Sequence, residues 1–327
     1  MVRQVESLAA DLAAKTAPVT ERIHDVLTDE ECASAAAVYL TGDGDSYHAA
    51  CAAEMSFESL AGVNCQSISA LRFTQYAAPW LAVSPAARPV VIAISAAGKT
   101  PQVVQAIEAA RTRGALTVAI TGVAEGPVAR AAGRSVVISL PAPERSPGIR
   151  TYQASLLGLM LTAIRLGEGR RHAHEIIARQ ELAALPAMVA ATAEMAKAPC
   201  RSLASLVADS PVLVMTGSGP SYGTALFSAA KMTEGAGVFA TGQDLEEWCH
   251  VESLADPADM PVFVIAPPGR SHKKGVEVAA IARRQGRRLI AITDAADTEV
   301  SAGSGKRLLA SAPGAGRFGE AADDLAG

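Results

Sequence analysis

The chain has 327 residues, of which 50% are hydrophobic and 4% aromatic, and its formal net charge is −4. This length and apolar content suffice for two domains of ordinary size, and the charge offers no electrostatic reason to bind nucleic acid. No apolar run reaches the roughly 18 residues that span a bilayer, so neither a nucleic acid nor a membrane is expected as a partner.

The first predicted element is an amphipathic helical segment over residues 1–33. Five short strand-like runs follow, separated by stretches that can form helices. They are Ala37–Leu40, Asn64–Ile68, Val90–Ser95, Leu116–Thr121 and Ser135–Leu140. Continuous apolar runs are typical of strands buried on both faces, and alternation of strand with helix predicts a parallel sheet covered by helices on both faces.

The strand pattern then restarts after a stretch without strand signals. Residues 151–197 are dense in apolar positions and are predicted to form a helical linker. The second set of strand-like runs is Val212–Met215, Val238–Ala240, Val262–Ala266, Leu289–Thr293 and Arg307–Ala310. The pattern therefore predicts domains over 34–150 and 198–313, followed by a loose tail over 314–327.

One loop occurs in both halves. Residues 42–47 read Gly-Asp-Gly-Asp-Ser-Tyr, and residues 217–222 read Gly-Ser-Gly-Pro-Ser-Tyr. A glycine turn between a buried strand and a helix can present N–H groups to an anion, although it can also be a tight turn and no more. The recurrence predicts a duplicated α/β domain. The dinucleotide-binding fingerprint lacks its third glycine in both copies, which argues against a dehydrogenase.

A second loop candidate is Ser95-Ala-Ala-Gly-Lys-Thr100, which follows the most strand-like run and opens a helix. The hydroxyls of Ser95 and Thr100 and the loop amides could hold an oxyanion, or the hydroxyls could cap the helix. The segment is not a Walker motif, because Ala93 stands where the first glycine is needed.

The richest polar stretch runs from Lys231 to Glu252. Lys231 and Glu234 are three residues apart, so on a helix they can pair, point into a pocket, or form a solvated face. Glu246, Glu247 and His250 also have helical spacing and could bind a metal. No His-x-x-x-His pair and no second ligand group accompany them, so no metal and no other cofactor is predicted.

Three segments together resemble the sugar isomerase (SIS) domain family. They are Gly44–His48, Ile94–Thr100 and Lys231–Glu234, the last followed sixteen residues later by His250. The resemblance covers roughly residues 33–313 and is strongest to double-SIS proteins, such as the isomerase portion of glucosamine-6-phosphate synthase. It implies two tandem flavodoxin-like domains, each with a five-stranded parallel sheet, and a homodimer with sites at the subunit interface.

The resemblance also implies roles for particular residues. Glu234 would be the base that moves a proton between C1 and C2 of the sugar, and Lys231 would assist it. His250 would help open the sugar ring, reaching the site of a neighbouring subunit. The implied substrate- and phosphate-binding residues are Gly44, Ser46, Ser95, Thr100, Arg150 and Glu247.

The phosphate loop departs from the family pattern Ser-Gln-Ser-Gly-Glu/Asp-Thr. Ala96 and Ala97 remove two side-chain contacts, and Lys99 replaces an acidic residue. Asp45 stands where the synthase has Thr, while Arg150 could restore anion binding through a bidentate fork. The glutaminase domain and the lysine-bearing tail of the synthase are missing, so glutamine-dependent amination is not expected.

The sequence therefore predicts an isomerase or deaminase that acts on a phosphorylated sugar or amino sugar through an enediol or enediolamine. One alternative is a non-catalytic protein that binds sugar phosphates and regulates; another is a deglycase acting on a fructosamine phosphate. The five scattered cysteines form no C-x-x-C pair, which favours reduced thiols and a cytoplasmic location.

Overall fold

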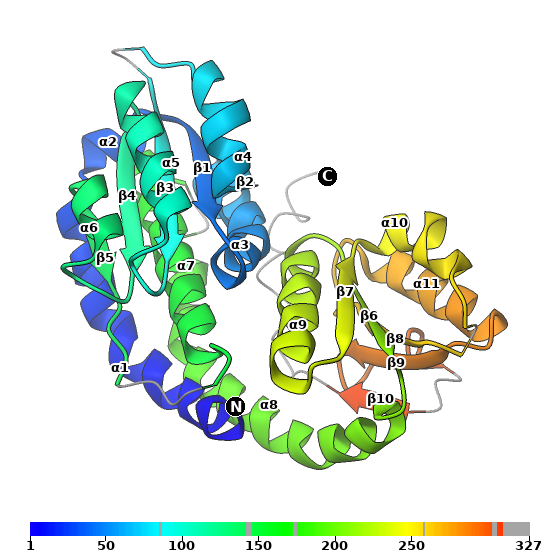
Figure 1. Cartoon of the computed structure of the whole chain (residues 1–327). Helices are drawn as coiled ribbons and strands as arrows, with labels where there is room; N and C mark the ends of the chain where they lie inside the picture. The colour runs from blue at the N-terminus through cyan, green and yellow to red at the C-terminus, as the bar shows by residue number, and fades with distance from the viewer. Residues whose placement is uncertain (85–86, 142–145, 173–174, 258, 303–305, 310–327) are drawn as a thin grey trace, which may run out of the picture. The chain divides into compact units, whose positions relative to one another are not determined.

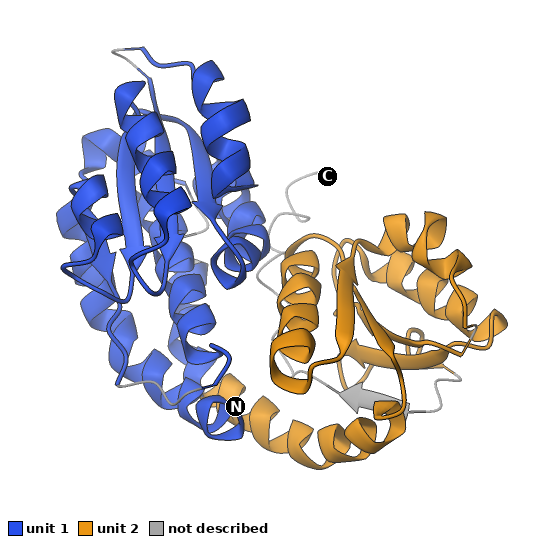
Figure 2. Ribbon diagram, viewed as in Figure 1, with its two compact units in different colours: residues 1–186 blue, residues 187–327 orange. Residues whose placement is uncertain are grey.

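The computed structural model describes residues 1–84, 87–141, 146–172, 175–257, 259–302 and 306–309 (Figure 1). The chain divides into two compact units, Met1–Pro186 and Ala187–Gly327 (Figure 2). This boundary falls inside the segment predicted as a helical linker, and the predicted tail over 314–327 lies outside the described residues. Among the described helices, none is long and apolar enough to cross a membrane.

The first unit is built on a parallel sheet with the strand order β2-β1-β3-β4-β5. Its strands are β1 (Ala35–Gly42), β2 (Cys65–Ser69), β3 (Arg88–Ser95), β4 (Leu116–Thr121) and β5 (Ser135–Val137). Every residue of β4 is buried, and so is every residue of β3 after its first. Such burial is what a parallel sheet covered on both faces requires.

The helices of the first unit form two layers around this sheet. They are α1 (Val2–Val26), α2 (Asp29–Ala33), α3 (Asp45–Ala61), α4 (Ala70–Arg72), α5 (Pro101–Thr112), α6 (Pro127–Ala132) and α7 (Arg150–Arg170), with a π-helical turn at Phe73–Ala77 and a 3-10 turn at Ala78–Trp80. Helices α3 and α7 pack together, and α1 and α2 lie against α7. Helices α5 and α6 pack against each other and against the central strands.

The second unit repeats this plan. Its parallel sheet has the order β10-β9-β8-β6-β7. The strands are β6 (Val212–Thr216), β7 (Phe239–Gln243), β8 (Pro261–Ile265), β9 (Arg288–Thr293) and β10 (Lys306–Leu309). The helices are α8 (Glu175–Val207), which begins in the first unit, α9 (Pro220–Ala236), α10 (Leu245–His250) and α11 (His272–Arg284), with a 3-10 turn at Glu252–Leu254.

Side chains of the second sheet alternate between two cores, as the two-residue period of a strand requires. Leu213 and Met215 pack with Ala225 and Ala229 of α9 and with Leu203 of α8. Between them in the chain, Val214 belongs to a different cluster, together with residues of α10 and α11. The second sheet is therefore covered by helices on both faces.

The predicted fold class is confirmed. Counted from its first strand, each sheet has the order 2-1-3-4-5, which is the flavodoxin-like arrangement. In such sheets ligands bind beyond the carboxyl ends of the strands. The loops after β1, β3 and β4 lie at that edge in the first unit, and the loops after β6 and β8 lie at the corresponding edge in the second.

Candidate functional site

The first glycine loop makes the expected tight turn between β1 and α3. Gly44 has φ 54° and ψ −128°, a conformation that strongly favours glycine. Ser46 is buried in the first turn of α3, and its N–H donates to the carbonyl of Asp43 over 3.2 Å. A Cβ on Gly42 would lie 2.9 Å from the Cβ of Ser46, so the strand end and the helix start approach very closely.

The second glycine loop has the same geometry. Gly219 has φ 58° and ψ −132°, and both α3 and α9 contain 17 residues. A hydrogen bond from each loop to the segment after the next strand also recurs in the two units. Asp43 accepts from the N–H of Ala70 over 3.2 Å, and Ser218 accepts from the N–H of Leu245 over 3.3 Å. The two turns are thus fixed to the following segment in the same way.

The loop after β3 brings two candidate residues together. The hydroxyls of Ser95 and Thr100 are 3.1 Å apart, and Ser95 is buried. Gly98 closes the turn with φ 65° and donates its N–H to the carbonyl of Ser95 over 3.0 Å. The side chain of Lys99 is exposed. Ser95 and Thr100 are therefore held as a pair at the carboxyl edge of the sheet, with α5 starting directly behind them.

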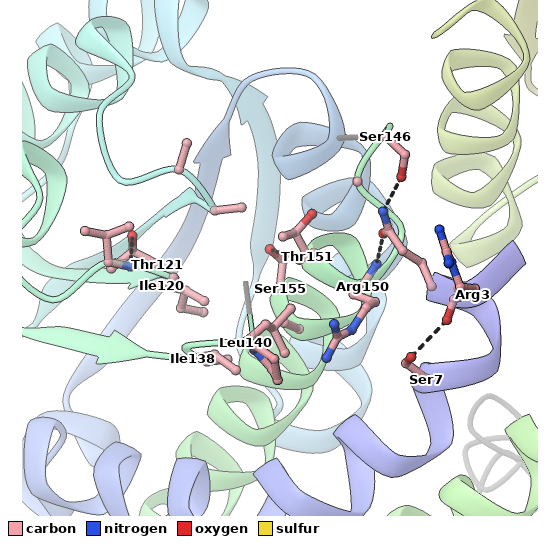
Figure 3. A pocket seen from close by; sticks show the side chains of 18 residues that line it. Arg3, Ser7, Ile120, Thr121, Ile138, Leu140, Ser146, Arg150, Thr151 and Ser155 are labelled. Atoms are coloured by element: carbon pink, nitrogen blue, oxygen red, sulfur yellow. Dashed lines mark hydrogen bonds between the residues drawn. The ribbon is translucent and has the colours of Figure 1, made fainter. Parts of the chain in front are cut away.

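A cavity of about 500 Å³ lies beside this loop (Figure 3). Ala96 and Ala97 form part of its lining, together with the end of β4, the segment after β5, and the starts of α1 and α7. Of the six predicted substrate- and phosphate-binding residues, Arg150 lines this cavity and the other five do not. The cavity thus lies beside the loop after β3, but the hydroxyl pair of Ser95 and Thr100 does not line it.

Arg150 is held by an acidic partner that the sequence did not reveal. Its Nε and Nη2 donate to the two carboxylate oxygens of Asp11 in α1, over 2.5 and 2.6 Å. Both side chains are 16% exposed. The hydrogen bonds that Arg150 donates to Asp11 raise the pKa of the guanidinium, and burial opposes this effect. The predicted bidentate fork therefore exists, but a carboxylate of the protein occupies it.

Gln4 is a second residue that sequence reasoning missed. Its side-chain oxygen accepts from the N–H groups of Ile149 and Arg150 over 2.9 and 3.2 Å, which caps the start of α7. Its amide nitrogen donates to the carbonyl of Pro147 over 3.2 Å. The signal in the sequence was spacing, because Gln4 stands one helical turn before the apolar position Leu8. In the structure Gln4 is buried.

In the second unit, Lys231 and Glu234 form a direct pair. The Nζ of Lys231 lies 2.6 Å from Oε2 of Glu234, as their spacing on α9 allowed. The Lys231 side chain is 5% exposed, whereas that of Glu234 is 48% exposed. The ammonium also lies 5.2 Å from the ring centroid of Phe227, within the range of a cation–π contact. A buried cation is thus placed directly behind a carboxylate that solvent can reach.

His250 belongs to a separate network. Its Nε2 lies 3.0 Å from Oε1 of Glu246, and Lys274 of α11 bonds the other carboxylate oxygen. The hydrogen bonds from Lys274 and then His250 lower the pKa of Glu246. Glu247 is exposed on the same short helix. Among the described contacts Glu234 pairs with Lys231 and His250 pairs with Glu246, so His250 stands apart from the other two catalytic candidates.

Metal-binding groups and cysteines determine which cofactor and redox chemistry the described residues could support. In the described part of the chain, no group of three or more His, Cys, Asp and Glu side chains is arranged to hold a metal ion. All five cysteines are free thiols, and Cys32, Cys51 and Cys65 are buried. Burial raises the pKa of the Cys32 thiol to about 11.

The sequence has curated relatives with one shared name. It is 26% identical over 261 residues to glutamine–fructose-6-phosphate aminotransferase (isomerizing) from Gloeobacter violaceus, covering 78% of this chain and 42% of the relative. It is 28% identical over 263 residues to the enzyme of that name from Bradyrhizobium diazoefficiens, covering 79% of this chain and 42% of the relative. The chain thus spans about two fifths of these relatives' length.

Solved structures share the fold. The C-terminal domain of glucosamine-fructose-6-phosphate aminotransferase from Francisella tularensis aligns with a TM-score of 0.79 at 16% identity, covering 92% of this chain and 88% of that one. Tagatose-6-phosphate ketose/aldose isomerase from Escherichia coli aligns with a TM-score of 0.72 at 19% identity, covering 96% and 85%.

The sequence profile of the SIS domain matches residues 32–165 and 206–313, most of each half of the chain. Both matched segments contain one complete glycine turn and the helix that follows it. The chain belongs to the SIS domain family.

Proposed function

We propose that the chain is a sugar isomerase acting on a phosphorylated sugar or amino sugar. The observation that supports this most is the pair formed by Lys231 and Glu234, 2.6 Å apart in a member of the SIS family. An aldose–ketose shift needs one base that removes a proton from one carbon and returns it to the next. The half-exposed carboxylate of Glu234 can reach a substrate and accept the proton, and the buried ammonium of Lys231 beside it can stabilise negative charge.

In the proposed reaction, Glu234 removes the proton from C2 of the open-chain aldose and the carbonyl oxygen at C1 becomes an enediol oxyanion. Lys231 stabilises the negative charge that develops. A proton then passes from the C2 hydroxyl to the C1 oxygen, and Glu234, now protonated, returns its proton to C1 as the carbonyl forms at C2, so the ketose forms with no net change in protons. His250 would act earlier, transferring a proton between the ring oxygen and the C1 hydroxyl as the ring opens. For an amino sugar, the same steps lead to an imine whose hydrolysis releases ammonia.

For substrate binding we propose the hydroxyl residues of the first unit. Ser46, Ser95 and Thr100, with the turn at Gly44, would hold the phosphate group at the carboxyl edge of the sheet. Arg150 would contribute if its contact with Asp11 opens, and Glu247 would bind sugar hydroxyls. The proposal also includes a homodimer, testable by light scattering on the purified chain, and a cytoplasmic location, for which free thiols are typical.

The decisive experiment is deuterium incorporation from heavy water, measured by NMR over a panel of sugar phosphates, amino-sugar phosphates and fructosamine phosphates. We expect incorporation at C1 or C2 with at least one member. Glu234→Gln should lower that rate by about 10²- to 10⁴-fold, the usual contribution of a general base. Glu108→Gln, on an exposed position of α5, is the matched control. Wild-type exchange in Glu234→Gln would overturn the assignment of the base.

A second candidate is a non-catalytic sugar-phosphate sensor. Ala96 and Ala97 favour it, because they leave the loop after β3 with fewer side-chain donors. The same panel separates the two functions. Saturable binding of a sugar phosphate without any exchange of carbon-bound hydrogen would establish the sensor, and exchange that disappears in Glu234→Gln would exclude it. Amine release from a fructosamine phosphate would instead identify a deglycase.

A further inference from the structure

Large apolar side chains are exposed on the segment that follows β2 in the first unit. Phe73 and Leu81 of this segment are buried in a core cluster. On its outward side, Tyr76 is 74% and Trp80 is 83% exposed, and Leu71 is exposed as well. Single exposed apolar residues are ordinary on a protein surface, but two large aromatic rings within five residues are not. Leu71, Tyr76 and Trp80 are called the Trp80 surface below.

The Trp80 surface has the composition of a protein interface and a firm support. Trp, Tyr and Arg are the residue types that contribute most to binding at interfaces. Arg72 is exposed within the same segment, and its guanidinium has no hydrogen-bond or ion-pair partner among the described residues. Helix α4 and the two turns after it pack against α5, and the ring of Phe73 lies 5.9 Å from that of Tyr39. The surface is therefore formed before a partner arrives.

The equivalent segment of the second unit also exposes apolar side chains. It follows β7, which has the place of β2 in the second sheet. Val251 is 58% and Leu254 is 77% exposed, and these two residues are called the Leu254 surface below. Val251 stands 175 residues after Tyr76, the separation that also relates Gly219 to Gly44. The repeat thus has an exposed apolar surface at the same place in both units.

The two surfaces differ in charge. Arg72 is the charged residue of the segment 69–84, whereas Glu252 and Asp256 are the charged residues of the segment 251–256. Asp256 is exposed. Two Trp80 surfaces, or two Leu254 surfaces, would bring like charges together. A Trp80 surface and a Leu254 surface are complementary, because apolar groups meet at the centre and opposite charges meet at the rim.

We propose that the Trp80 surface of one chain binds the Leu254 surface of a second copy of this chain. The inference rests on the homodimer of the proposed function and names the surfaces that form it. In a two-fold dimer the contact occurs twice, so both surfaces of both chains are covered at once. A different protein would need to match two apolar surfaces of opposite charge, which a second copy does by itself.

The exposed area is sufficient for such a dimer. Tyr76 and Trp80 together expose roughly 300 Å², since each such side chain can bury about 150–250 Å². The two contacts, counted on both partners, then bury roughly 1,200 Å², which is the lower end of the range for specific interfaces.

The test is sedimentation velocity of the full chain over a range of concentrations, with no sugar present. We expect a dimer whose dissociation constant rises about tenfold or more in Trp80→Ala and in Leu254→Ser. Phe239→Ala is the matched control, because it removes an exposed aromatic ring at the opposite end of β7 and should leave the dimer unaltered. Circular dichroism checks that each variant is folded. An unchanged dimer in folded Trp80→Ala would overturn these surfaces but not the homodimer, whereas a monomeric wild-type chain would overturn both.

A charge exchange tests which surface faces which. Arg72→Glu should weaken the dimer severalfold, and adding Asp256→Arg to that variant should restore most of the lost affinity, because opposite charges meet again. Arg113→Glu makes the same change at an exposed position outside the Trp80 surface and should have no effect. Failure of Asp256→Arg to restore the dimer would overturn the pairing of the two surfaces. Association is measured without catalysis, so a failure of the proposed isomerase activity in the deuterium experiment leaves this result unchanged.

Discussion

The ammonium of Lys231 lies 2.6 Å from the carboxylate of Glu234, with the cation buried and the anion half exposed. The two partners therefore contribute differently to stability. Glu234→Ala leaves a buried ammonium without its carboxylate, which should lower the free energy of unfolding by about 1–3 kcal/mol. Lys231→Met fills similar space and leaves a carboxylate that water can solvate, so its cost should stay below about 1 kcal/mol.

Urea unfolding of both variants checks this asymmetry. Glu234→Gln is the matched control, because its side-chain oxygen can still accept a hydrogen bond from Lys231 and should retain part of the stability. Equal losses in Glu234→Ala and Lys231→Met would mean that burial of the ammonium does not decide the energetics of the pair.

The glycine turns give a second prediction. Gly44 and Gly219 share a conformation near φ 55° and ψ −130° that other residues rarely adopt. No atom lies within 4 Å of a Cβ built on Gly44, so Gly44→Ala would meet backbone strain without a steric clash. We expect Gly44→Ala and Gly219→Ala each to lower the free energy of unfolding by about 1–3 kcal/mol.

A third glycine supplies the control for these turns. Gly237 ends α9 with φ 68° and ψ 15°, the left-handed helical region that Asn tolerates, and its Cβ position is also open. Gly237→Asn should therefore cost clearly less than either alanine variant in the same denaturation experiment. Similar losses at all three positions would contradict the backbone-strain argument.

The sequence allowed most of the fold to be predicted because the central strands are continuous apolar runs. Leu116–Thr121 was predicted residue for residue as β4. Strand ends were predicted less closely in central and edge strands alike, since β1 extends two residues beyond each end of the predicted Ala37–Leu40. β7 continues through Thr241, Gly242 and Gln243, which are partly exposed and polar, so hydrophobicity placed its end too early. β5 ends at Val137, before the predicted Leu140.

In the candidate site, contacts between residues close together in the sequence could be predicted, whereas contacts between distant residues could not. The pairing of Lys231 with Glu234 and the contact of His250 with Glu246 follow from helical spacing alone. The contact of Asp11 with Arg150 joins residues 139 positions apart, and the cap from Gln4 spans a similar separation. Such contacts depend on how α1 lies on α7, which periodicity within either helix does not determine.

Glu31 supplies a pH-dependent prediction. Its hydrogen bond with Arg134, at 2.8 Å, lowers the pKa of the carboxyl group, and partial burial opposes this. The folded-state pKa thus lies below the unfolded value. The resulting stability is fully present above the unfolded pKa and is lost as pH falls through the folded pKa. Glu31→Gln should accordingly lower the free energy of unfolding at about pH 7 by roughly 1 kcal/mol, and by less at about pH 3.

Urea denaturation at several pH values measures this difference. Glu30→Gln, at the exposed neighbouring position, removes a carboxyl group from the same short helix and serves as the control. A cost of Glu31→Gln that is the same at every pH would contradict the prediction, because a change in packing alone would not titrate.

The last prediction concerns the competition for Arg150. Asp11 engages its Nε and Nη2, the edge that would otherwise form a bidentate pair with a phosphate. If Arg150 binds the sugar phosphate, Asp11→Asn should tighten binding of fructose 6-phosphate severalfold by releasing the guanidinium. Arg150→Ala should weaken it about tenfold, which corresponds to about 1.4 kcal/mol. Calorimetry on both variants, with Asp25→Asn as an exposed control on α1, measures these changes. Unchanged affinity in Asp11→Asn and Arg150→Ala would instead assign the pair to joining α1 and α7, because a purely structural contact would alter unfolding without altering the affinity for phosphate.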